Sequence, residues 1–120
     1  MHNLDLMNLR DEIAIIGMAG RFPGACDIDR FWQNLRDGVE SITFFSPEEQ
    51  VASGVNPEVL KDPNYVPAAG YLEEADSFDA SFFGISPKEA EIIDPQHRIF
   101  LECAWSAIEN AGYDPEQYDG

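Results

Sequence analysis

The sequence predicts an α/β fold of which this chain holds only a part. Residues 13–18 form an uninterrupted apolar run that leads into glycine-rich sequence, a pattern typical of a strand buried on both faces. Helix-capping signatures mark several helical pieces after it. A doubly buried strand has to pair along its edges, yet no partner strand of comparable strength follows. We therefore expect the chain to be the opening part of a larger domain, with Gly120 not a natural domain boundary.

The predicted strand enters a glycine-rich turn, which raises the alternative of a phosphate-binding loop. Gly17, Gly20 and Gly24 have neither the spacing of a dinucleotide-binding fingerprint nor the lysine of a P-loop. Pro23 also removes a backbone N–H that a phosphate would need. We interpret the segment as a tight turn.

The first helix is predicted over Ile28–Asp37. Asp27 is a suitable N-cap, and Gly38 supplies the residue that ends the helix. The apolar side chains of this helix share one face: Ile28, Phe31, Trp32 and Leu35.

Only short elements are expected in the middle of the chain. Ser46 and Glu49 form a capping box for a short helix that ends at Gly54, and a further helical turn spans residues 56–60. The loop that follows is rich in Pro, Gly, Asn and Tyr and predicts one short edge strand around residues 70–72.

Two successive start signals precede the longest predicted helix. Ser86 and Glu89 form a capping box for a short helix over Pro87–Ile93, and Asp94 then caps a second helix that Gly112 ends. Apolar residues cover most of the circumference of this second helix, so we expect a core helix. Its contact with water is predicted only near Glu102, Ser106, Glu109 and Asn110.

The charge balance excludes several classes of partner. Lys and Arg total 7 against 23 Asp and Glu, a formal net charge of −16, so nucleic acid and anionic membrane surfaces would repel the chain. No apolar stretch approaches the roughly 18 residues of a membrane span, and residues 1–12 lack a signal-peptide core. We expect a cytoplasmic protein in which residues 1–12 are a leader or connector. Cys26 and Cys103 fit neither a disulfide framework nor a metal-ligand pattern, which predicts free thiols.

Four motifs resemble, in order, those of one protein family. Residues 13–24, IAIIGMAGRFPG, are similar to its opening strand and turn, and Phe31-Trp32 with Leu35 and Gly38 fit its first helix. Residues 78–90, FDASFFGISPKEA, and 94–98, DPQHR, are similar to its signature. From about Ile13 to Gly112 the chain thus resembles the β-ketoacyl synthase domain of type I modular polyketide synthases. The resemblance implies part of a thiolase-like layered α/β/α fold, with residues 13–120 as the N-terminal part of the domain, truncated before the catalytic motifs.

The family's chemistry is not expected within this chain. Ketosynthases condense an acyl thioester with a malonyl-type extender by a decarboxylative Claisen reaction that uses a cysteine nucleophile and two histidines. The family's motifs for these residues come later, so we expect no catalytic, cofactor-binding or metal-binding residue here, and no cofactor. Cys26 and Cys103 each follow or precede an acid and lack the electropositive setting of a reactive thiol; Cys103 is expected to pack in the core. His97 is expected to be hydrogen-bonded at its helix start, and Arg21 and Arg98 to pair with carboxylates.

The resemblance also implies partners for the intact protein. These are acyl carrier protein and the remaining synthase domains, and the complete protein would be a homodimer. Carrier proteins are acidic, so their docking surface should be basic and should come mainly from outside this acidic segment. The fragment alone is expected to be inactive. The alternative is a small acidic helical interaction module, related to the synthase, that folds alone and binds a partner without catalysis.

Overall fold

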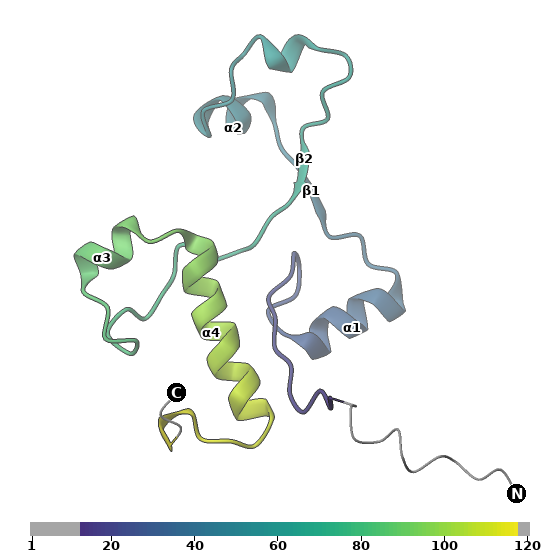
Figure 1. Cartoon of the computed structure of the whole chain (residues 1–120). Helices are drawn as coiled ribbons and strands as arrows, with labels where there is room; N and C mark the ends of the chain where they lie inside the picture. The colour runs from purple at the N-terminus through teal and green to yellow at the C-terminus, as the bar shows by residue number, and fades with distance from the viewer. Residues whose placement is uncertain (1–12, 118–120) are drawn as a thin grey trace, which may run out of the picture.

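The computed structural model describes residues 13–117, in which the regular elements are short and widely spaced (Figure 1). The helices are α1 (Ile28–Asp37), α2 (Pro47–Ala52), α3 (Pro87–Ile92) and α4 (Pro95–Asn110); the strands are β1 (Ile42–Phe44) and β2 (Ala68–Gly70); 3-10 turns span Val59–Lys61 and Pro115–Gln117. The leader or connector predicted over residues 1–12 lies outside the described residues. None of the helices between residues 13 and 117 combines the length and the apolar character needed to cross a bilayer.

The predicted helix starts are confirmed, because side chains provide acceptors for the first N–H groups of each helix. Asp27 accepts a first-turn N–H of α1 at 2.7 Å, and Asp94 accepts one of α4 at 2.8 Å. Ser46 and Ser86 each form a reciprocal capping box with the glutamate three residues later. Gly38 ends α1 in the left-handed region at φ 67°, as its position predicted.

α4 is the longest helix, as predicted, but it is not a core helix in this structure. None of its residues is buried, and Phe100 is 70% exposed. One side of α4 faces the loop before α3, where Phe82 and Phe83 meet Trp105 edge to face with ring centroids 4.6 and 6.5 Å apart. The prediction was wrong because the apolar surface of α4 is larger than the described elements can cover.

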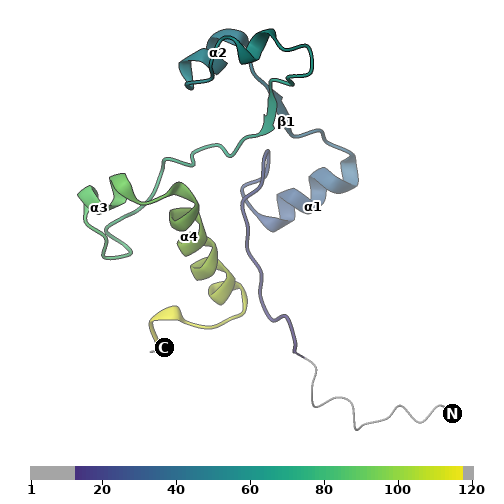
Figure 2. The same ribbon diagram turned by 45° about the horizontal axis from the view of Figure 1, so that its top comes forward.

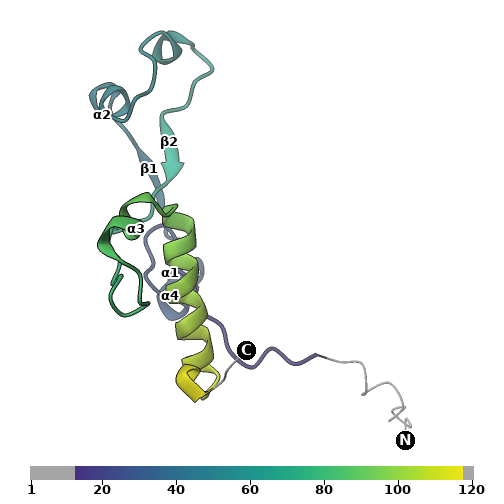
Figure 3. The ribbon, with the colours of Figure 1, turned by 60° about the vertical axis from the view of Figure 1, so that its left-hand side comes forward.

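The two strands pair at the base of a projection that carries α2 (Figures 1 and 3). We call this projection, residues 42–70, the arm, and its two paired strands the neck of the arm. They pair antiparallel, with Ile42 opposite Gly70 and Phe44 opposite Ala68. β2 lies slightly before the edge strand predicted around residues 70–72, and β1 was not predicted. Three residues are too short a run for an alternating pattern to stand out, so β1 depends on its partner rather than on a local signal.

The strand predicted over residues 13–18 is not formed in this structure. The segment is outside every strand, and Ile13, Ile15 and Ile16 are 96%, 86% and 63% exposed. No backbone-to-backbone hydrogen bond reaches it from any other part of residues 13–117. A strand exists only through its pairing, and the described residues contain no partner for this one.

Almost no core forms within the described residues. Among them only Ala25 and Asn34 are buried, where the turn at residues 22–25 folds against α1. Asn34 donates its side-chain N–H to the carbonyl of Gly24 at 2.9 Å. The Cα radius of gyration is 20.7 Å, against roughly 14 Å for a compact domain of this length. Figure 2 shows the same openness, with the arm standing clear of α3 and α4.

Candidate functional site

One polar cleft of the described residues lies between the segment 18–21, the start of α1 and one side of α4. Its volume is about 410 Å³. We refer to it as the α1–α4 cleft. Its polar and sulfur-bearing walls are formed by Arg21, Cys26, Asp27, Asp29, Glu102, Cys103, Ser106 and Asn110.

Three contacts fix the extended segment along α4 and so form one wall of the cleft. Arg21 Nη2 lies 2.6 Å from Glu102 Oε2, and Met18 N–H donates to Asn110 Oδ1 at 3.1 Å. Gly17 lies so close to α4 that an added Cβ would come within 2.4 Å of the Ala107 carbonyl oxygen. Only glycine fits this approach.

The Arg21–Glu102 contact confirms the predicted ion pair and corrects the prediction for Glu102. The two side chains are 35% and 20% exposed, so Glu102 is not the solvent-facing residue that the helical pattern suggested. Its Oε2 atom is fully covered and has no hydrogen-bond partner among residues 13–117. We therefore describe the contact as a close ion pair without the alignment of a hydrogen bond.

The two cysteines are free, as predicted, and both line the α1–α4 cleft. Cys26 is exposed, and its Sγ donates to Asp27 Oδ2 at 3.5 Å. Cys103 is half-buried, so it lacks the full burial that was expected of a core residue. Backbone hydrogen bonding from Arg30 holds the pKa of Asp27 below its ordinary value; partial desolvation opposes this, and the Cys26 thiol adds to it.

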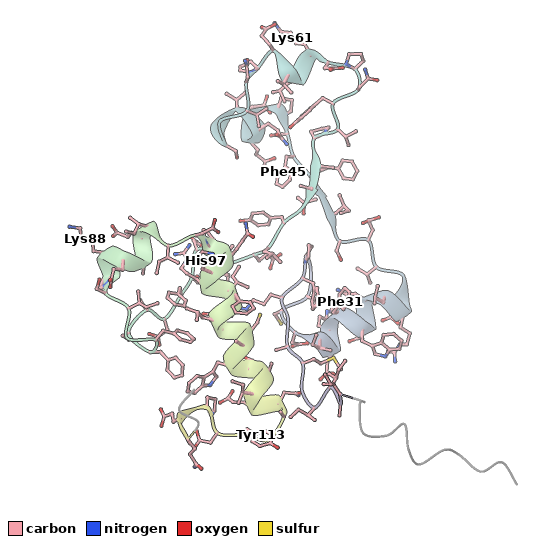
Figure 4. The ribbon with its side chains drawn as sticks, viewed as in Figure 1. Phe31, Phe45, Lys61, Lys88, His97 and Tyr113 are labelled. Carbon is pink, nitrogen blue, oxygen red and sulfur yellow. The ribbon has the colours of Figure 1, made fainter. Side chains whose placement is uncertain are left out.

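His97 does not join either thiol. It is exposed in the first turn of α4, at the end of the helix remote from Tyr113 (Figure 4). Cys103 lies six positions further along the helix, which amounts to about 9 Å along the helix axis. Its ring makes no hydrogen bond within residues 13–117, so the expected hydrogen bond at the helix start is wrong. The helix start is already satisfied by Asp94.

Arg98 is also placed differently from the prediction. No carboxylate among the described residues pairs with it; one of its guanidinium N–H groups donates to the carbonyl of Ala90 at 3.3 Å. That carbonyl belongs to α3, so Arg98 ties α3 to α4. Its Nε atom is covered and has no partner in the described part of the chain.

The cleft holds no assembled catalytic group. Within residues 13–117 no cluster of three or more His, Cys, Asp or Glu side chains is arranged to hold a metal ion. Each thiol has an acid next to it in the sequence, and no histidine of the described residues adjoins either one. The sequence did not single out Asn34, and it named Asn110 only as a water-facing position of the long helix. In both cases the available signal was a polar residue beside an apolar helical face.

Comparison with known proteins gives a consistent result. Residues 10–120 match the family described as "Beta-ketoacyl synthase, N-terminal domain". A subunit of the phenolphthiocerol/phthiocerol polyketide synthase of Mycobacterium tuberculosis H37Rv is 55% identical over 110 residues, which are 92% of this chain and 7% of that protein. Polyketide synthase PksN of Bacillus subtilis is 50% identical over 103 residues, 86% of this chain and 2% of that protein.

Solved structures extend the similarity to the fold. The ketosynthase from module 1 of the bacillaene synthase of Bacillus amyloliquefaciens is 50% identical with a TM-score of 0.67, over 83% of this chain and 17% of that chain. The module 6 ketosynthase of the Bacillus subtilis bacillaene synthase is 40% identical with a TM-score of 0.71, over 84% and 17%. These are thiolase-like domains, so the predicted fold class is confirmed. The chain spans about a sixth of these ketosynthases and under a tenth of the polyketide synthases it matches.

Proposed function

This chain belongs to the β-ketoacyl synthase family, and from that membership we propose that it is the N-terminal part of a polyketide ketosynthase domain, supplying scaffold and no catalytic residue. The observation that carries the proposal is the match of most of the chain to about a sixth of the module 1 and module 6 bacillaene ketosynthases, at 50% and 40% identity. The openness of the structure supports it, because the elements expose apolar surface that a larger domain would cover.

The proposed reaction of the intact domain is a decarboxylative Claisen condensation. An acyl group is held as a thioester on a cysteine, and a malonyl-type extender on acyl carrier protein loses carbon dioxide to form the attacking enolate. Two histidines stabilise that enolate, and backbone N–H groups stabilise the thioester oxyanion. Residues 13–120 contribute none of these groups. Cys26 and His97 are exposed and separate, and no histidine of the described residues adjoins Cys103, which supports this division.

The proposed partners follow from the same division. Acyl carrier protein and the remaining synthase domains act with the intact protein, which is a homodimer in the cytoplasm. The net charge of −16 supports a carrier-docking surface formed mainly by other parts of the synthase, since carrier proteins are acidic.

An independent acidic interaction module is the competing function. A module that folds alone needs its own core, and only Ala25 and Asn34 are buried in the described part of this chain. The structure therefore favours the scaffold function over the module.

A chimeric ketosynthase tests the proposal. Residues 13–117 replace the matching segment of the module 1 bacillaene ketosynthase, which is 50% identical to this chain. The chimera and the chain alone are each incubated with an acyl thioester, and acyl transfer is measured by intact mass spectrometry. We expect the chimera to become acylated and the chain alone to remain unmodified.

A double variant, Cys26→Ser with Cys103→Ser, is the matched control. In the chimera it should become acylated as readily as the unsubstituted form, because neither thiol is the nucleophile. Acylation of the chain alone at either thiol, or a chimera that folds but accepts no acyl group, would contradict the proposal.

A further inference from the structure

We draw no further inference here: the strongest candidate, the surface of the arm on which Phe44, Val51, Val59 and Val66 are exposed, carries nothing because nothing in the structure shows what covers it.

Discussion

Urea unfolding of the chain alone should show no single cooperative transition. The perturbation is the absence of the rest of the ketosynthase. Variants that each keep one tryptophan report separately on α1 and on α4. Trp32 on α1 is 63% exposed, whereas Trp105 on α4 is half-buried against Phe82 and Phe83. With no shared core, the two regions have little reason to unfold together.

The expected size of the urea m-value follows from the accessible surface area of the chain. An unfolded chain of this mass exposes roughly 19,000 Å² and a compact one roughly 6,500 Å²; this structure exposes 10329 Å². It therefore buries roughly 70% of the area that a compact domain buries. Because the urea m-value scales with the area exposed on unfolding, any apparent m-value should not exceed roughly 70% of the usual one.

Far-UV circular dichroism and tryptophan fluorescence are recorded on the Trp32→Phe and Trp105→Phe variants across the same titration. We expect the emission of Trp32 to be close to that of solvent-exposed indole throughout, and that of Trp105 to shift at a midpoint different from the loss of helix signal. Coincident midpoints with a full-sized m-value would refute the reasoning. They would also favour the independent interaction module.

Three further predictions concern single contacts. In the chimera, Gly17→Ala should lower the free energy of unfolding by about 1–3 kcal/mol, because the new Cβ meets the α4 backbone, and urea titration measures this loss; an unchanged midpoint would contradict the placement of Gly17. A double-mutant cycle of Arg21→Met and Glu102→Gln in the chimera should give a coupling of about 1 kcal/mol, because the pair is partly covered; additive effects would contradict the ion pair. The side-chain hydrogen bond from Ser86, followed by its backbone N–H, holds the pKa of Glu89 below its ordinary value of 4.5. The contribution of this capping box to stability is therefore fully present above pH 4.5 and is lost as the pH falls through the lowered pKa. In an NMR titration, Ser86→Ala should move the pKa of Glu89 back up. An unmoved pKa would contradict the Ser86 hydrogen bond as its cause.

The local parts of the fold could be predicted from the sequence because their causes are local. Asp27, Ser46, Ser86 and Asp94 each act within one helical turn, so a few consecutive letters contain the whole interaction. The free thiols were predictable for the same reason. Family motifs then supplied the thiolase-like layered arrangement, which no local signal could give.

The remaining features depend on contacts between distant segments. The Met18–Asn110 bond spans 92 positions, and Glu102 looked solvent-facing because its partner Arg21 belongs to another segment. The predicted strand at residues 13–18 failed for the opposite reason. Its apolar pattern is that of a strand covered on both faces, and the described residues provide nothing to cover those faces.

The neck of the arm has a consequence for sequence change in this family. β1 and β2 are three-residue strands that bring Phe44 and Ala68 together. The residues between these two positions therefore form one loop whose ends are closed by the strand pair. Doubling the length of such a loop adds only about 0.6 kcal/mol to the entropic cost of closing it. Residues between the two strands can therefore be inserted or deleted with little effect on the distance between α1 and α4. The arm is for this reason the natural place in this chain for length variation and for grafting a reporter sequence.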